Sequence, residues 1–289
     1  MWALACRRLI WPKGSTFIFY NQGGRDRRLT AQVTGTGNII LVPFGEVTFA
    51  NPLNSYTGST TLMSGALRLE ADNALGATAL LDIRPGTRFS LDGHAQTLPQ
   101  VLLQQDGKFD FGNGGELRLM HGGVLQGQLS GSGKMQVDTG TLTARGDAAA
   151  LDVHTTLARG VTANLNQPEA LGRGPLEING RLTMSVPRHH VWSRPLSGSG
   201  QLEISGNAKG DGSSSITMNT GDGFSGITTF GGGTFVAGTR PGEGFGGSGK
   251  LVIEASAHIT GRGYIARICN CMARWRCQAG PDWCCAKKP

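Results

Sequence analysis

A short unit in which small residues and glycines lead into an alternating strand recurs four times along the chain. The copies are VTGTGNIILV (33–42), LSGSGKMQVD (129–138), LSGSGQLEIS (196–205) and FGGSGKLVIE (245–254). In each copy the residues two and four positions after the second glycine of the Gly-x-Gly are apolar, and most of their neighbours are polar. This period of two predicts a half-buried strand that is entered through a glycine turn.

Two longer units also recur. YTGSTTLMSGALRL (56–69) returns as FSGITTFGGGTFVA (224–237), with the aromatic, hydroxyl, glycine and paired threonine positions preserved without gaps. SGALRLEADNALG (64–76) returns as RGVTANLNQPEALG (159–172), and both end in Ala-Leu-Gly. Self-similarity of this kind is typical of repeat architectures.

The spacings between these copies suggest the length of the repeat. Gly35 precedes Gly131 by the same interval by which Gly76 precedes Gly172. This interval is four times a length of roughly 24 residues, and the two copies of the first longer unit are separated by seven times that length. We therefore expect a repeat of roughly 24 residues.

Several short strands per repeat, with no helical pattern, indicate a β-solenoid. One turn cannot bury its inward apolar residues alone, whereas turns stacked about 4.8 Å apart share a continuous core. We therefore expect residues 31–264 to form an all-β solenoid of about ten rungs. Residues 1–30 are expected to be an irregular N-terminal segment, and residues 265–289 a disordered tail rich in Cys, Trp and Arg.

The net charge of +7 would ordinarily suggest nucleic acid or an anionic membrane as a partner. However, 11 of the 27 Lys and Arg residues lie in 1–30 and 265–289, together with two acidic residues. The body between them keeps 16 basic and 18 acidic residues, and these are placed singly. We therefore expect no basic face on the body and no nucleic-acid partner.

Cysteine is concentrated outside the body. Five of the six cysteines lie in the tail 265–289, and the sixth is Cys6. A long β-rich body without cysteine suits a protein that crosses an oxidising periplasm unfolded. The run from Cys269 to Cys285 lacks the two CxxC pairs of a zinc ribbon, and the six histidines show no zinc-binding spacing. We expect no metal and no cofactor.

The segment 54–98 carries two runs of residues at fixed offsets. They are Asn54, Tyr56, Thr57, Gly58, Thr60, Thr61, Gly65, Leu67, Leu69 and Ala74-Leu75-Gly76, then Leu91, Gly93, Gln96, Thr97 and Leu98. Both runs resemble the passenger repeats of autotransporters, and the likeness covers about residues 31–264. The resemblance implies a right-handed parallel β-helix (solenoid) displayed at the bacterial cell surface as an adhesin, and it says little about the ligand.

In the autotransporter family an export signal precedes the passenger, and a C-terminal β-barrel anchors it in the outer membrane. MWALACRRLIW does not form a convincing signal, because Arg7 and Arg8 interrupt its apolar start. A barrel of about twelve strands would not fit after the repeats. We therefore interpret the chain as a fragment of such a protein, attached to the outer membrane only through a barrel that it lacks.

Arg145-Gly146-Asp147 is the integrin-type tripeptide, and it follows the strand GTLTA where a turn is expected. At a corner it would present a cation and a carboxylate to a receptor. The tripeptide also arises by chance in a glycine-rich chain, because turns favour Gly and Asp. These three residues are the binding residues that we single out from the sequence.

Two patterns of catalytic or nucleotide-binding proteins are incomplete. GFGGSGK (244–250) matches the start of a phosphate loop, but Leu251 stands where Ser or Thr is required, and LVIE predicts a strand. No G-x-S-x-G elbow is followed by a strand-to-helix pattern. We expect no catalytic residue and no enzyme activity.

Three functional hypotheses follow. The leading one is a structural and adhesive rod for cell adhesion, aggregation or biofilm formation, with a receptor or glycan on a host or neighbouring cell as partner and self-association as a further expectation. The second is a polysaccharide-active β-helix enzyme, which needs carboxylates clustered on one exposed face. The densest acidic pairs are Asp106/Asp110 and Asp82/Asp92. The third is a non-functional remnant of a truncated autotransporter gene.

Overall fold

The computed structural model describes residues 8–21, 23–206, 214–219, 223–240, 244–262, 264–265 and 268–271. Every regular element within these ranges is a β-strand. The described residues include no helix long and apolar enough to cross a membrane. The chain divides into unit 1 (Met1–His154 with Glu169–Arg173) and unit 2 (Thr155–Pro168 with Gly174–Pro289), and each unit is described by itself.

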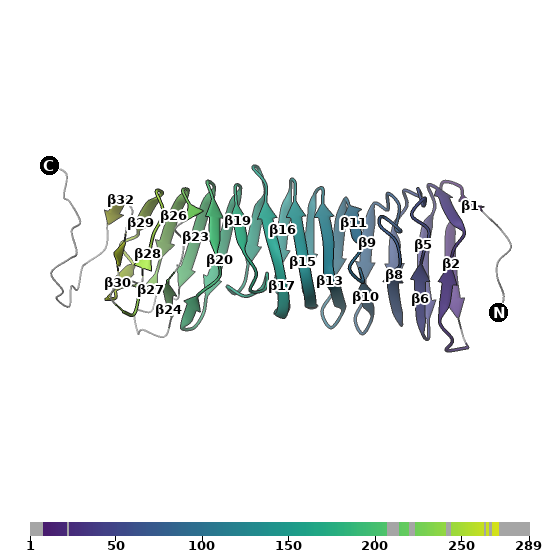
Figure 1. Cartoon of the computed structure of the whole chain (residues 1–289), viewed down its shortest axis with the longest axis horizontal. Helices are drawn as coiled ribbons and strands as arrows, with labels where there is room; N and C mark the ends of the chain where they lie inside the picture. The colour runs from purple at the N-terminus through teal and green to yellow at the C-terminus, as the bar shows by residue number, and fades with distance from the viewer. Residues whose placement is uncertain are drawn as a thin grey trace. The chain divides into compact units, whose positions relative to one another are not determined.

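Unit 1 contains two main parallel sheets, to which each turn of the chain adds one strand. Sheet 1 has the order β2 (Thr16–Asn21), β5 (Asn38–Pro43), β7 (Thr60–Leu62), β9 (Leu80–Ile83), β12 (Gln100–Leu103), β14 (Gly122–Leu125) and β16 (Thr141–Ala144). Sheet 2 has the order β3 (Arg27–Leu29), β6 (Glu46–Phe49), β8 (Ala66–Leu69), β10 (Arg88–Ser90), β13 (Lys108–Leu119) and β15 (Gln128–Val137). Figure 1 shows the successive strands of unit 1 side by side, from purple at β2 to teal at β16.

Shorter pairings complete unit 1. β1 (Arg8–Trp11) pairs with β4 (Gln32–Gly35), and β11 (Ala95–Leu98) pairs with the second arm of β13. β13 and β15 change register between Asp110 and Gly115, where Gly112 and Gly114 adopt positive φ angles of 70° and 82°. Only glycine adopts such angles without strain, so the two long strands bend there and form a further side of the coil.

The core of unit 1 is built from alternate residues of each strand. In β5, Ile39 and Leu41 are 2% and 1% exposed, as the period of two predicted. In sheet 2, Phe89 and Phe109 occupy the same inward column one turn apart, with ring centroids at 4.9 Å. Removal of these side chains from water supplies the main stabilisation of each turn, at about 1.5–3 kcal/mol per large side chain.

Glycines form the corner at which the chain passes from sheet 1 to sheet 2. Gly107, Gly127 and Gly146 follow β12, β14 and β16 and stack on one another. A Cβ atom on Gly127 would overlap the carbonyl oxygen of Gly107, and one on Gly146 would overlap that of Gly127. The corner therefore requires glycine because of close backbone packing between turns.

Several residues of the autotransporter-like pattern join neighbouring turns. The buried amide of Asn54 accepts the Val33 N–H at 2.7 Å and donates to the Ala74 carbonyl at 2.6 Å. The hydroxyl groups of Tyr56 and Thr60 lie 2.7 Å apart, and burial raises the pKa of Tyr56 above its ordinary value, so the phenol stays neutral. The pattern thus satisfies buried polar groups inside the coil, which explains its role in the fold.

Unit 2 continues the same architecture with its own parallel ladders. The longest ladder has the order β18 (Thr162–Leu165), β20 (Arg181–Val186), β23 (Gln201–Gly206), β26 (Ile227–Gly231), β29 (Lys250–Ile253) and β32 (Ile268–Cys271). A second ladder has the order β17 (Asp147–Leu157, of which the end belongs to unit 2), β19 (Leu176–Ile178), β22 (Leu196–Gly198) and β25 (Gly223–Phe224). A third has the order β21 (His190–Trp192), β24 (Ser215–Met218), β27 (Gly233–Ala237) and β30 (Ala257–Thr260), and β28 (Gly244–Phe245) pairs with β31 (Tyr264–Ile265). The chain is therefore an all-β parallel solenoid, as predicted. Sheet 1 of unit 1 records seven turns and the longest ladder of unit 2 records six, which agrees roughly with about ten rungs.

The turn in unit 1 is shorter than the roughly 24 residues predicted from the spacing of the repeats. Register partners on adjacent strands of sheets 1 and 2 in unit 1 lie 18 to 22 positions apart, and mostly 20 to 22. The interval from Gly35 to Gly131 does not give the length of a turn, because these two glycines occupy different sides of the coil. Gly35 precedes β5 of sheet 1, whereas Gly131 lies within β15 of sheet 2. Similar glycine-led sequences therefore serve different corners, and their separation is not a whole number of turns.

The predicted boundaries at the two ends have different outcomes. Residues 8–29, expected to be irregular, contain β1, β2 and β3, which pair with β4, β5 and β6, so the coil extends to Arg8. Phe17 and Phe19 continue the inward columns of Ile39 and Leu41 and account for this correction. Most of the tail 265–289 lies outside the described residues, apart from Ile265 and β32, so its disorder stays a prediction.

Candidate functional site: the charged outer face of sheet 2

The outer face of sheet 2 in unit 1 carries two columns of charged and polar residues. The first column, in register along the strands, is Arg28, Thr48, Arg68, Ser90, Asp110 and Ser130. The second is Glu46, Arg88, Lys108 and Gln128, with the apolar Ala66 between Glu46 and Arg88. Because neighbouring strands lie about 4.8 Å apart, long side chains reach those of the next turn.

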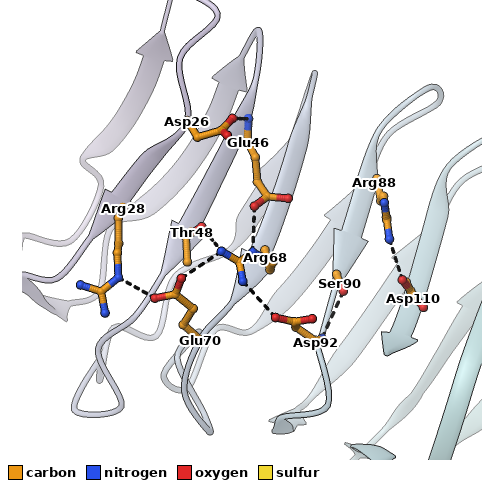
Figure 2. Close-up of polar contacts among 10 residues, drawn as sticks. All are labelled: Asp26, Arg28, Glu46, Thr48, Arg68, Glu70, Arg88, Ser90, Asp92 and Asp110. Carbon is orange, nitrogen blue, oxygen red and sulfur yellow. Dashed lines mark hydrogen bonds and ion pairs between the residues drawn. The ribbon is translucent and has the colours of Figure 1, made fainter. Parts of the chain in front are cut away.

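Arg68 on β8 joins three turns of this face (Figure 2). Its guanidinium donates to Glu46 at 2.8 Å, to Glu70 at 2.9 Å and to Asp92 at 3.0 Å. Thr48 lies beside it and is 4% exposed. The hydrogen bonds to Glu46 and then to Asp92 raise the pKa of Arg68, so this cation stays charged at any physiological pH.

Glu70 extends the network by one further turn, to β3. It accepts a hydrogen bond from Nε of Arg28 at 2.5 Å as well as from Arg68. The hydrogen bond from Arg28 is the main cause that lowers the pKa of Glu70. Asp26 accepts the backbone N–H of Glu46 at 3.0 Å. Cations and carboxylates thus alternate and neutralise each other, which holds adjacent turns in register.

Arg88 and Asp110 form a second cluster on the same face, apart from the Arg68 network in Figure 2. Asp110 accepts from Arg88 at 2.7 Å, from the Gly112 N–H at 3.1 Å and from Ser130 at 3.1 Å. Burial opposes ionisation of this carboxyl, but the hydrogen bonds from Arg88, Gly112 and Ser130 outweigh it and lower the pKa of Asp110. Asp110 is therefore an anion with its acceptor sites largely occupied.

A pocket of about 400 Å³ opens beside this second cluster, and we call it the Lys108 pocket. Its lining residues come from β10, β13, β15 and the start of β17, and they are Arg88, Lys108, Asp110, Gln128, Leu129, Ser130, Asp147, Ala149 and Ala150. A volume of this size lies in the usual range of small-molecule sites. The pocket brings together two cations, two carboxylates and uncharged polar groups on one outer face.

The predicted binding tripeptide lies at the corner between β16 and β17. Arg145 and Asp147 are exposed, whereas Gly146 is buried in the glycine stack of this corner. One carboxylate oxygen of Asp147 accepts the Ala149 N–H at 3.0 Å, and Asp147 also lines the Lys108 pocket. The glycine thus has a packing cause of its own. Receptor binding through the tripeptide stays a prediction.

The acidic pairs that were densest in the sequence do not gather into one cluster. Asp82 lies on β9 of sheet 1, bound to Arg84 at 2.9 Å, whereas Asp92 follows β10 of sheet 2 and binds the Arg68 network. Among the described residues, no group of three or more His, Cys, Asp or Glu side chains is arranged to hold a metal ion. The carboxylates that do share a pocket are Asp110 and Asp147, which lie far apart in sequence.

Arg88, Lys108 and Gln128 were not predicted from the sequence. A signal for them existed, because polar residues recur at the spacing of one turn along both outer columns. A repeat of roughly 24 residues does not place these positions above one another, so the sequence alone did not reveal the two columns. With 20 to 22 residues per turn they align.

No protein-family model matches the chain, and no solved structure matches it. Two proteins of Escherichia coli (strain K12) are similar to it. The uncharacterized lipoprotein YdeK is 32% identical over 161 residues, which is 56% of this chain and 12% of that protein. The uncharacterized protein YuaQ is 28% identical over 162 residues, which is 55% of this chain and 12% of that protein.

The chain is also similar to the adhesin BmaC autotransporter of Brucella suis biovar 1 (strain 1330). The two are 30% identical over 227 residues, which is 74% of this chain and 6% of that protein. The chain thus spans 12% or less of the length of these curated relatives. It is a parallel β-solenoid with distant similarity to an autotransporter adhesin.

Proposed function

We propose that the chain is a stretch of an autotransporter passenger that acts at the bacterial cell surface as a structural and adhesive rod. The observation that carries this proposal is the similarity to the adhesin BmaC autotransporter over 74% of the chain. The similarity to the lipoprotein YdeK also favours a location at the cell envelope. The passenger would be held at the outer membrane by a part of the longer protein.

The physics of the fold supports a rod. Each turn contacts mainly its neighbours, so length grows by adding turns without redesigning the core. Relatives that are many times longer than this chain agree with such growth. Adhesion then depends on the outer faces, whose side chains contribute little to the core.

Surface display tests this proposal directly. The full chain would be fused to an outer-membrane anchor in a non-aggregating bacterium, with display checked by protease accessibility, and cell settling and attachment to epithelial cells would be measured. We expect both to rise above the level of the anchor alone. The matched control is the displayed variant Phe109→Asp, which buries an unpaired charge and should unfold the coil. Attachment by the intact chain no higher than by the anchor alone would contradict adhesion and favour a non-functional remnant.

The Lys108 pocket keeps a polysaccharide-active enzyme as the second candidate. Its carboxylates Asp110 and Asp147 share one exposed face with Arg88 and Lys108. However, Asp110 is already bound by three donors, which leaves it a poor general base. Release of new sugar ends from acidic and neutral polysaccharides would be measured, and release that disappears in Asp147→Asn would support the enzyme.

A further inference from the structure

The Lys108 pocket contains a cation, Lys108, that forms no ion pair with the described residues. Lys108 and Arg88 are register partners on adjacent strands, so two like charges face each other on the outer surface. Arg88 is paired with Asp110, whereas the ammonium group of Lys108 makes no ion pair or side-chain hydrogen bond with any residue in the part of the chain that the structure describes. Like charges directly opposite each other destabilise a sheet. A bound anion would remove this cost.

The rest of the pocket restricts which anion fits. Asp147 and Asp110 would repel a compact, highly charged anion such as phosphate or sulfate. Gln128, the register partner of Lys108 on β15, has an amide that makes no hydrogen bond with a described residue. This amide can both donate and accept. The carboxylate of Asp147 keeps acceptor sites beyond its bond to Ala149, and it would accept from hydroxyl groups.

A sugar unit that carries one carboxylate and several hydroxyl groups meets all of these conditions. We propose that the Lys108 pocket binds a carboxylate-bearing sugar of an acidic polysaccharide, with Lys108 contacting the carboxylate and Gln128 and Asp147 contacting the hydroxyl groups. This inference rests on the proposed function, because a displayed rod is where the chain would meet such a polymer. Ala149 and Ala150 keep the pocket open, since longer side chains there would fill it.

Calorimetric titration of the purified full chain tests this proposal. The probe is a galacturonic acid oligomer, and its methyl ester is the matched neutral probe with the same sugars. We expect the acid to bind at least about tenfold more tightly than the ester, as one charge-assisted hydrogen bond predicts. Equal affinity for both probes, or no binding of the acid, would overturn the proposal.

Two lysine variants make the test specific. Lys108→Gln keeps the length of the side chain and removes its charge, and we expect it to weaken binding of the acid by about tenfold. Lys134→Gln is the control, because Lys134 is also exposed but is paired with Glu116 outside the pocket. It should leave the affinity unchanged. An equal loss of affinity in both variants would indicate general electrostatic attraction and would contradict binding in the Lys108 pocket. Wild-type affinity in Lys108→Gln would do the same.

The two proposals fail in different ways. Suppose that cells displaying the chain attach to epithelial cells, and that cells displaying Lys108→Gln attach as well as wild type to a surface coated with the acidic oligomer. The proposal of sugar binding in the Lys108 pocket is then wrong, and the proposal of an adhesive rod is retained. If the purified chain binds the oligomer through Lys108 but displayed cells attach no better than the anchor alone, the pocket stands and the adhesive rod is wrong.

Discussion

The two sheets of unit 1 have similar inward faces, whereas the side chains on their outer faces differ in polarity. Below both sheets the inward columns are mainly apolar, and most of their side chains are buried. Outside sheet 2, Arg68 and its carboxylate partners form a network. Outside the first turns of sheet 1, Ile18 and Tyr20 are 58% and 55% exposed, and the Tyr20 ring lies 6.3 Å from that of Phe44. One chain thus builds a charged and an apolar surface on one core.

This difference separates the part of the sequence that specifies the coil from the part available for contacts. Most inward positions must be apolar, because each turn is stable only when its inward side chains pack on those of the next turn. The outward positions carry no such demand. An exposed apolar group such as Ile18 or Phe44 costs little in the fold, and a charged group is tolerated where the next turn supplies its partner.

Truncation of side chains on the inward faces of the two sheets should cause the largest loss of stability. Phe109→Ala below sheet 2 should cost about 3–5 kcal/mol, and Leu81→Ala below sheet 1 about 2–5 kcal/mol, because each leaves a cavity in the core. Urea unfolding would measure both. The outward neighbour Leu102 provides the control, since Leu102→Ala should cost much less. Losses below about 1 kcal/mol in both core variants would contradict close packing of the core below the two sheets.

The corner between the two faces gives the next largest effect. Gly146→Ala should destabilise the fold by about 1–3 kcal/mol, because its Cβ would overlap the carbonyl of Gly127. Asp147→Ala, one residue further along, should change stability by about 0.5 kcal/mol or less. Thermal unfolding of the two variants compares them. Equal stability would show that the corner adapts to a side chain and that the glycine stack is not required.

The charged face itself should contribute less. Arg68→Ala removes three ion pairs at once, and we expect a loss of about 1 kcal/mol in dilute buffer, since the partly exposed network is screened by water. The loss should shrink in about 1 M salt. Ile18→Ala on the apolar face should show no such salt dependence. A loss for Arg68→Ala that is insensitive to salt would mean that its carbon stem, and not its charge, matters.

Acid should produce the smallest effect, and on the charged face it acts through Glu70 and Asp110. The pKa values of Glu70 and Asp110 are lowered in the fold, so their stabilisation is present above the ordinary values of 4.5 and 3.8 and is lost as pH falls through the folded pKa. The free energy of unfolding should therefore decrease as pH falls below about 4.5. Glu70→Gln should flatten this decrease, as measured by urea titration at several pH values. An unchanged pH profile would remove Glu70 from the network.

The sequence by itself determined the class of fold and the direction of its side chains. The alternation in β5 placed Ile39 and Leu41 in the core, and the recurrence of glycine-led strands indicated a coil without helices. These conclusions need only local patterns, because a strand exposes alternate residues whatever its neighbours are. The resemblance carried by Asn54 and Tyr56 pointed to the adhesin similarity, and in this coil both side chains form buried hydrogen bonds.

Only the tertiary structure decided which distant residues meet. Arg88, Lys108 and Gln128 are adjacent because the coil places each of them one turn from the next, and repeated glycines on different sides of the coil concealed the length of that turn. The bend in β13 near Gly112 shifts the register further. Contact between side chains on successive turns depends on the summed length of every corner and strand between them. A change of one residue there moves a whole column to the other face of the sheet.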